Sequence, residues 1–261
     1  MNIAERLDVR RSEQAGCLVA TLTGRLDTRS YSGLRDLLVK LALEEPRALI
    51  VDVDALDIHD GGALTVFPAA QVMVHEWPGV PVLLAAGDAD RRTALGEGAA
   101  MRSVPVFTGV EPALDSVRTV VTQRRAAAEF PPLPSSAAVA RRFARDICRY
   151  WRVPVAPHEV LCVVSELVEN AVRHAATRFQ LRLRMRDGML GVAVHDGSPR
   201  PAMLRQGPSG IPAGFGLRIV AELARDWGCL PDLGNGKVVW AVLSGAEDWF
   251  RAHPPWPVDE P

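Results

Sequence analysis

The chain has 261 residues, which is enough for two domains that each bury a core of their own. Hydrophobic residues make up 48% of the sequence, charged residues make up 23%, and the formal net charge is −1. This balance is typical of a globular protein and gives no electrostatic reason to expect binding to nucleic acid or to an anionic membrane. Arginine carries almost all of the positive charge, because Lys40 and Lys237 are the only lysines.

The apolar residues do not form an export or membrane segment. The first eight residues contain no continuous apolar run of the kind that a signal peptide has. No uninterrupted apolar stretch approaches the roughly 20 residues that cross a bilayer. We therefore expect a soluble, cytoplasmic protein that contacts neither a membrane nor nucleic acid directly.

Strand-like and helix-like patterns alternate through the first half of the chain. Apolar residues with strand character predict strands at residues 17–22, 48–53, 80–85 and 104–107. Helical spacing of apolar residues, or helix-favouring composition, predicts helices at residues 31–43, 61–75 and 112–124. Pro68 should kink or break the second of these helices, because it cannot donate a backbone hydrogen bond.

A domain boundary is expected after the third helix. Residues 123–129 can extend that helix, and the proline-rich segment 130–134 then ends it. Ser135 and Ser136 can cap a further helix over residues 137–151. The sequence therefore predicts a first domain at 1–122, a linker at 123–134, a second domain at 135–245 and a tail at 246–261.

The stretch 163–174 carries the first candidate site residues on a predicted helix. Glu166 and Asn170 are four residues apart, so they project from one face of that helix. An asparagine amide can coordinate magnesium through its oxygen without adding negative charge beside a triphosphate. A carboxylate one turn earlier could orient or deprotonate an attacking hydroxyl or water. Taken alone, such a pair on a helix is more often a neutral surface feature.

Two downstream features strengthen the case for a nucleotide site. Residues 190–197 alternate as a strand and end in Asp196 and Gly197. A carboxylate at a strand end can accept a hydrogen bond from the exocyclic amine of adenine. Gly214 and Gly216 then precede a predicted helix at 218–227. Glycines before a helix let backbone N–H groups approach phosphate, and the helix N-terminus favours the anion.

The order and spacing of these features resemble the GHKL ATPase superfamily, which includes gyrase, sensor histidine kinases and anti-sigma-factor serine kinases. The resemblance covers residues 130–244 and is strongest to small actinobacterial anti-sigma-kinase-like proteins, through motifs at 165–174, 196–199, 214–217 and 236–240. It implies a Bergerat-type α/β sandwich that binds ATP and Mg. It also implies Glu166 as the catalytic base, Asn170 as the magnesium ligand and Asp196 as the adenine reader, with further nucleotide contacts from Gly197, Gly214, Gly216 and Leu217.

Three departures from the superfamily pattern concern how the nucleotide is held. The motif at 196–199 lacks the two later glycines of the superfamily's Asp-x-Gly-x-Gly. Ala213 and Phe215 stand where an arginine often neutralises the γ-phosphate. Val238 stands where the subgroup has a threonine, whose hydroxyl could help to bind adenine. ATP binding is still expected, whereas phosphoryl transfer is left open.

Residues 13–120 resemble a STAS domain, the fold of anti-sigma-factor antagonists, and another small α/β domain is the alternative. The resemblance rests on the motif at 24–27, the strand at 48–53 and the turn at 56–64. Phosphorylated antagonists have a serine at the start of a helix, where phosphate adds about −1.5 to −2 charges. This chain has Gly61 and Gly62 there, then Ala63, and its next hydroxyl is Thr65. The resemblance therefore implies a domain that the usual phosphorylation cannot switch.

Together these features predict a two-domain α/β protein, with a STAS-like sheet-and-helix domain followed by a GHKL sandwich. The leading hypothesis is a Mg-ATP-binding partner-switching regulator that binds a sigma factor or phosphorylates a STAS-domain antagonist on serine. Its own STAS domain would serve as an intramolecular docking or autoinhibitory module. The alternative is a catalytically inactive, nucleotide-sensing pseudokinase or scaffold for the same partners. A histidine kinase is disfavoured because no dimerisation helix presents a phosphoacceptor histidine.

Overall fold

The chain folds into two compact units, Met1–Val121 and Thr122–Pro261, in a computed structural model. The structure describes residues 2–4, 7–58, 60–96, 99–118, 124–203, 205–206, 212–213 and 215–244. Each unit combines a main β-sheet with helices, so the predicted two-domain α/β class is confirmed. Within the described ranges, no helix is both long enough and apolar enough to cross a membrane.

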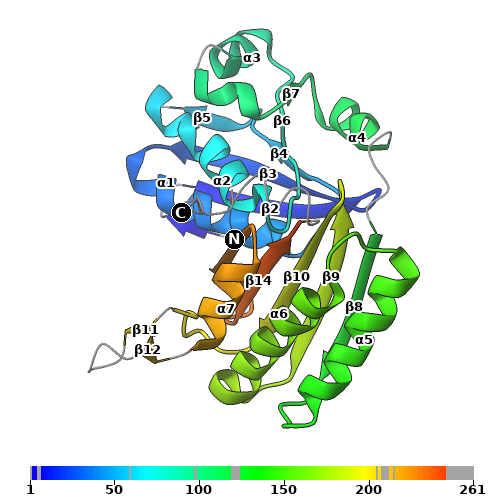
Figure 1. The fold of residues 1–261 in the computed structure, drawn as a ribbon. Helices are drawn as coiled ribbons and strands as arrows, with labels where there is room; N and C mark the ends of the chain where they lie inside the picture. Colours follow the sequence, from blue (N-terminus) through cyan, green and yellow to red (C-terminus); the bar gives the residue numbers. More distant parts are fainter. Residues whose placement is uncertain are drawn as a thin grey trace, which may run out of the picture. The chain divides into compact units, whose positions relative to one another are not determined.

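The N-terminal unit is built on a mixed sheet. Its described strands follow the order β1-β2-β3-β4-β6-β7, with β5 paired to β3 (Figure 1). β2 and β3 form an antiparallel hairpin, whereas β3, β4, β6 and β7 run parallel to one another. The strands are β1 (Asn2–Ala4), β2 (Leu7–Gln14), β3 (Cys17–Leu26), β4 (Leu49–Asp52), β5 (Leu56–Ile58), β6 (Val82–Ala85) and β7 (Val106–Phe107). All four strands predicted for this half of the chain are present.

Helices cover both faces of this sheet, because successive strand residues point to opposite sides. Val19 and Ile50 form a core with α4 (Val110–Arg118) on one face. On the other face, α1 (Thr28–Ala42) and α2 (Val66–His75) contact the strands and each other. The described remainder of the unit includes α3 (Ala89–Gly96) and the 3₁₀ turn η2 (Ala99–Ser103).

The helix predicted at 61–75 is divided into two parts. A 3₁₀ turn, η1 (Gly61–Thr65), precedes α2, and the carboxylate of Asp60 accepts a hydrogen bond from Gly62 N at 2.9 Å. Pro68 lies in the first turn of α2, where a missing N–H costs no intrahelical hydrogen bond. The predicted break therefore occurs, but it falls before the proline rather than at it.

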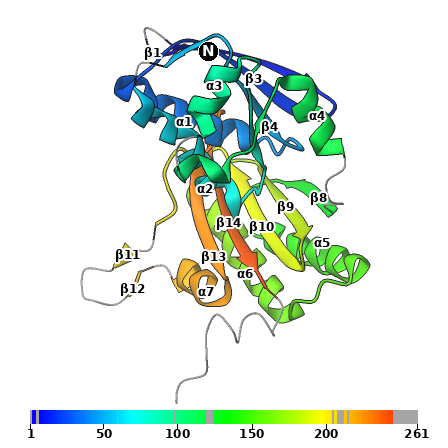
Figure 2. The ribbon, with the colours of Figure 1, turned by 90° about the horizontal axis from the view of Figure 1, so that it is seen from above.

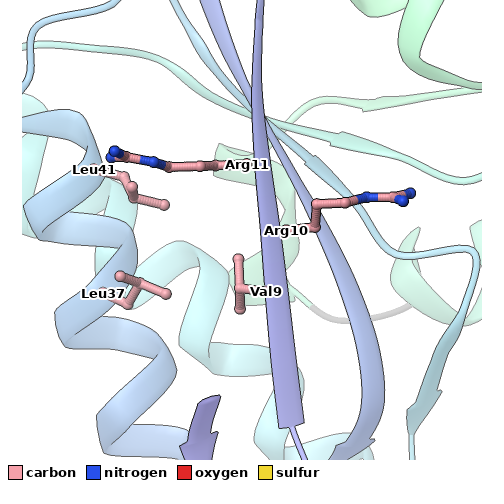
Figure 3. A pocket seen from close by; sticks show the side chains of 5 residues that line it. All are labelled: Val9, Arg10, Arg11, Leu37 and Leu41. Atoms are coloured by element: carbon pink, nitrogen blue, oxygen red, sulfur yellow. The ribbon is translucent and has the colours of Figure 1, made fainter. Parts of the chain in front are cut away.

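A cavity of about 300 Å³ lies between β2 and α1 in the N-terminal unit (Figure 3). Its walls are Val9, Arg10 and Arg11 from the strand and Leu37 and Leu41 from the helix. Val9 and Arg11 project toward α1, and Arg10 projects to the other side of the strand, as alternation along a strand requires (Figure 3). None of the predicted nucleotide-site residues lines this cavity.

The C-terminal unit contains an antiparallel sheet in the order β13-β14-β10-β9-β8 (Figure 1). The strands are β8 (Arg124–Phe130), β9 (Phe179–Arg186), β10 (Met189–Asp196), β13 (Asp226–Pro231) and β14 (Lys237–Leu243). A short described pair, β11 (Arg205–Gln206) and β12 (Pro212–Ala213), forms a separate ladder.

The helices of this unit pack on one face of its sheet (Figures 1 and 2). They are α5 (Ser136–Trp151), α6 (Pro157–Asn170) and α7 (Phe215–Leu223), and the π turn η3 (Ala171–Ala175) follows α6 directly. Their apolar residues share one core with alternate residues of β8, β9, β10 and β14. This two-layer arrangement is the α/β sandwich that the sequence predicts.

Residues 124–130 form a strand, whereas the sequence analysis assigns 123–134 to a linker and 123–129 to a helix extension. α4 ends at Arg118, and β8 pairs along its whole length with β9. Exposed and half-buried side chains alternate from Arg125 to Glu129 along β8. The last residue of the strand, Phe130, is buried and stacks on Phe179 with ring centroids 5.6 Å apart. The helical expectation for this alanine-rich stretch is wrong, because pairing with a neighbouring strand overrides a weak local propensity.

Candidate functional site

α6 places the predicted catalytic and magnesium residues on one helix face, as the sequence predicts. The helix begins with Pro157 in its first turn, a position that favours proline because the N–H there has no intrahelical partner. Its buried stripe anchors it to the sheet through Val160, Val163, Val164, Leu167 and Val168. Glu166 and Asn170 are both half-buried beside this stripe, and Asn170 is the last residue of the helix.

The N-terminus of α7 lies directly against Glu166. α6 and α7 are in contact, and a Cβ added at Gly216 would overlap Oε2 of the Glu166 carboxylate. A side chain at position 216 would push the carboxylate of Glu166 aside, so glycine there lets the two residues lie together. Burial raises the pKa of Glu166, and the negative charge of Glu169 raises it further, against a smaller opposing effect of Arg173. A carboxyl group with a raised pKa suits a base that must take up a proton near neutral pH.

Asp196 lies at the end of β10, as predicted, and its side chain is fully buried. Its Oδ1 atom accepts hydrogen bonds from Lys237 Nζ at 2.8 Å and from Ser198 N at 2.9 Å. Its Oδ2 atom is buried and has no hydrogen-bond partner among the residues that the structure describes. A buried acceptor without a partner is costly, because it has lost water and gained nothing in return. Oδ2 is therefore the atom of this carboxylate that a ligand donor would satisfy.

Close backbone packing fixes the ends of the strands around Asp196. Gly197 N donates a hydrogen bond to Thr177 Oγ1 at 2.9 Å, which joins the end of β10 to the segment after α6. A Cβ added at Gly236 would overlap the carbonyl oxygen of Asp196. Glycine at 236 therefore lets β14 approach β10 closely where the two strands pair Asp196 with Lys237.

The donor atoms present fit magnesium bound together with a nucleotide. The side-chain nitrogen of Asn170 is buried and has no partner in the described part of the chain, so it is open to donate a hydrogen bond to a ligand, whereas the amide oxygen is the atom that can coordinate magnesium. Within the same residues, no group of three or more histidine, cysteine, aspartate or glutamate side chains could hold a metal ion by itself. Magnesium commonly takes one or two protein oxygens and completes its shell with phosphate oxygens and water.

The structure does not support Gly214 and Leu217 as nucleotide contacts in the way that it supports Gly216. Gly214 lies outside the described residues. The side chain of Leu217 is buried in the core of the unit, so only its backbone stands in the first turn of α7. Arg218, in the same turn, is exposed.

The strand register changes the interpretation of Val238 and identifies a residue that the sequence analysis did not assign. Val238 pairs with His195 and therefore lies on the sheet face opposite Asp196, so a hydroxyl at 238 would not have reached that carboxylate. Lys237 pairs with Asp196 and lies on the same face. One signal could have pointed to it, because Lys237 is one of only two lysines among 30 basic residues.

Comparison with known proteins identifies the family of this unit. Residues 130–243 match the model of the histidine kinase-like ATPase domain family. No curated protein sequence matches the chain.

Solved structures with similarity to parts of the chain share little sequence identity with it. An anti-sigma factor antagonist from Mycobacterium paratuberculosis is 17% identical, with a TM-score of 0.38, over 43% of this chain and 94% of that chain. The RsbU and RsbW domains of a Mycobacterium tuberculosis protein are 15% identical, with a TM-score of 0.36, over 46% of this chain and 32% of that chain. The anti-sigma factor antagonist SpoIIAA in its unphosphorylated form is 16% identical, with a TM-score of 0.33, over 43% of this chain and all 100% of that chain.

The matched range runs from the last residue of β8 to the last residue of β14. It therefore includes Glu166, Asn170, Asp196 and Lys237 together with the described helices α5, α6 and α7. The resemblance to GHKL ATPases is confirmed for this half of the chain. The chain contains a domain of the histidine kinase-like ATPase family at residues 130–243.

Proposed function

We propose that the C-terminal domain binds Mg-ATP, with Asp196 as the adenine reader, Asn170 as the magnesium ligand and the N-terminus of α7 at the phosphates. The observation that carries this proposal is the buried Oδ2 atom of Asp196, which has no hydrogen-bond partner among the described residues. The buried amide nitrogen of Asn170 also lacks a partner there and would donate to an acceptor of the ligand, while its amide oxygen would be the atom that coordinates magnesium. Polar atoms in these positions gain most from a ligand that supplies their missing partners. Gly216, Gly197 and the backbone of Leu217 complete the proposed contacts, and Gly214 is proposed from the sequence motif alone.

Bound Mg-ATP would supply an electrophilic γ-phosphorus with ADP as the leaving group, and magnesium would help to neutralise the phosphate charge. Glu166 would then accept the proton of an attacking hydroxyl, since it lies beside Gly216 at the start of α7 and its pKa is raised. Gly216 leaves room for the carboxylate, and the buried stripe of α6 holds it in position.

We propose that the chain uses this site as a cytoplasmic partner-switching regulator of the anti-sigma-factor serine-kinase type. Its partners would be a sigma factor or a separate STAS-domain antagonist that offers a serine hydroxyl. The N-terminal unit would be a STAS-like module that docks in the same chain, where tethering raises its effective concentration. Its 3₁₀ turn η1 begins with two exposed glycines, Gly61 and Gly62, and so offers no hydroxyl at the position of the usual phosphoserine.

A pseudokinase or scaffold is the second candidate, and the residues expected near the γ-phosphate favour it. Ala213 and Phe215 stand where the superfamily often has an arginine, and the described Arg218 is exposed. Retention of Glu166 beside the N-terminus of α7 favours the enzyme. The two candidates share nucleotide binding and differ only in phosphoryl transfer.

Nucleotide binding is tested by isothermal titration of the full chain with Mg-ATP. Binding by the wild type and severe weakening by Asn170→Ala are expected, because the amide is the proposed protein ligand of magnesium. Glu159→Gln, on the first turn of the same helix, is the matched control and should bind like the wild type. Absence of binding heat with the folded wild type would refute both candidates.

Phosphoryl transfer is tested by incubating the chain and candidate STAS antagonists with ATP labelled at the γ-phosphate. Label on an antagonist serine that disappears with Glu166→Gln supports the kinase. ATP binding with no label on any antagonist supports the pseudokinase. The N-terminal unit should carry no label, and a phosphate at Thr65 would contradict that expectation.

A further inference from the structure

Lys237 and Asp196 form an ion pair that is removed from water. The ammonium nitrogen lies 2.8 Å from Oδ1, and the side chains of Lys237 and Asp196 are 4% and 0% exposed. The two residues are directly opposite each other on β14 and β10 and point to the same face of the sheet. A buried pair of this kind loses the hydration of two ions, so it is seldom explained by stability alone.

The contacts of the two carboxylate oxygens are unequal. Oδ1 accepts from both Lys237 Nζ and Ser198 N, at 2.8 Å and 2.9 Å. Oδ2 is equally buried and accepts from no described residue. Lys237 and Ser198 N together therefore leave this carboxylate with one open oxygen, although a free carboxylate offers two oxygens.

A carboxylate with one open acceptor distinguishes the two purines. Adenine presents an exocyclic amine at C6, which needs a single acceptor, whereas guanine presents an oxygen there, which a carboxylate repels. Guanine can still bind a carboxylate through its N1–H and its 2-amino group, but those two donors lie side by side and require two open oxygens. An Asp196 with Oδ1 occupied can therefore accept from the 6-amino group of adenine, but it can pair with only one of the two adjacent donors of guanine.

We propose that Lys237 is the positioning residue that makes the site selective for adenine over guanine nucleotides, by occupying Oδ1 of Asp196 and leaving Oδ2 open. This inference rests on the proposed binding of nucleotide at Asp196.

The residue type at 237 agrees with this role. The chain uses arginine for all but two of its 30 basic residues, yet it has a lysine here. A guanidinium is a planar fork that commonly binds both oxygens of a carboxylate, and it would close Oδ2 as well. An ammonium is a compact charge without that fork, and here it contacts Oδ1 at 2.8 Å.

The experiment compares dissociation constants of the full chain for Mg-ATP and Mg-GTP by titration calorimetry. The wild type should prefer ATP. Lys237→Met keeps the length of the side chain without its charge, and it should lower the ATP-over-GTP preference on the order of tenfold to a hundredfold, the range for one hydrogen bond to a charged group. Lys40→Met removes the only other lysine and should leave the preference unchanged.

The ratio of the two affinities separates positioning of Asp196 from general support of the fold. A variant with a damaged fold would bind ATP and GTP more weakly by similar factors and would keep the preference for ATP.

The double variant Asp196→Asn, Lys237→Met keeps the inference testable if Lys237→Met does not fold, because it removes both buried charges. In the Asp196→Asn background, Lys237→Met should change ATP affinity by less than about twofold, since Lys237 acts through Asp196. An unchanged nucleotide preference in folded Lys237→Met, or a full further loss in the double variant, would overturn the inference while ATP binding itself stands. A wild type that binds neither nucleotide would instead overturn the proposed function.

Discussion

His195 makes the stability of the C-terminal unit depend on pH in a defined direction. It lies one residue before Asp196 on β10, on the opposite face of the sheet, and its Nε2 atom is buried without a partner among the described residues. Burial lowers the pKa of His195 from 6.5 to about 3, and the positive charge of Arg182 contributes to the shift. Between about pH 3 and pH 6.5, the folded unit therefore holds a neutral imidazole where the unfolded chain holds a protonated one.

The sign and size of the effect follow from proton linkage. Between pH 6.5 and about pH 3 the unfolded state binds one more proton at His195 than the folded state, so stability falls as pH falls through this window. At about pH 4.5, two units below the unfolded pKa, the loss is about 3 kcal/mol, because each unit corresponds to about 1.4 kcal/mol. The imidazole contributes no such loss above about pH 7.5.

The assay compares the unfolding free energy of the C-terminal unit at about pH 8 with that at about pH 4.5. Each value comes from hydrogen exchange of the backbone amides of β10 and β14 in urea, corrected for intrinsic exchange rates. Carboxyl groups also titrate in this range, so the readout is the difference between the wild type and His195→Gln. The variant should lose about 3 kcal/mol less than the wild type on acidification. His174→Gln, at an exposed histidine, is the control. Equal losses in the wild type and His195→Gln would refute the reasoning.

Three further predictions concern the proposed site and the N-terminal unit. Gly216→Ala should lower the rate of phosphoryl transfer by about tenfold or more, because the new methyl group overlaps the Glu166 carboxylate and displaces the base. Gly61→Ala is the control, because a Cβ at that position meets nothing within 4 Å. The acid limb of the rate profile should lie above the usual pH range of a glutamate, because the pKa of Glu166 is raised, and Glu169→Gln should move it down by removing one cause of that shift. Gly61→Ser places a hydroxyl at the start of η1, where a side chain has open space around it. After incubation with an active anti-sigma kinase, mass spectrometry should find phosphate on the introduced serine in this variant and none at this position in the wild type.

Residues that act within one element could be predicted from the sequence. Glu166 and Asn170 share a face because an α-helix repeats every 3.6 residues, and α6 confirms this spacing. Asp196 is expected at a strand end because the strand-like residues before it give way to Gly197, and β10 does end at Asp196. The apolar stripe of α6 and the glycine at the start of α7 follow from the same local rules.

Residues 124–130 show where local rules fail. Alanine and glutamate favour a helix, so the sequence predicts a helical extension followed by a linker. The stretch instead completes the sheet of the C-terminal unit, because β9 would otherwise have an unpaired edge next to the buried Phe179. The boundary between the units lies between Val121 and Thr122, before this strand begins.

The sequence by itself determined the class of each half of the chain, the histidine kinase-like ATPase motifs, and the residues that share a face of α6. Only the tertiary structure decided which residues from different elements meet. It joined Lys237 to Asp196 across 41 residues, placed Val238 on the opposite face, and brought Gly216 against Glu166. The physical reason is that a periodic pattern specifies the faces of one helix or strand, whereas contacts between elements depend on strand register and close packing.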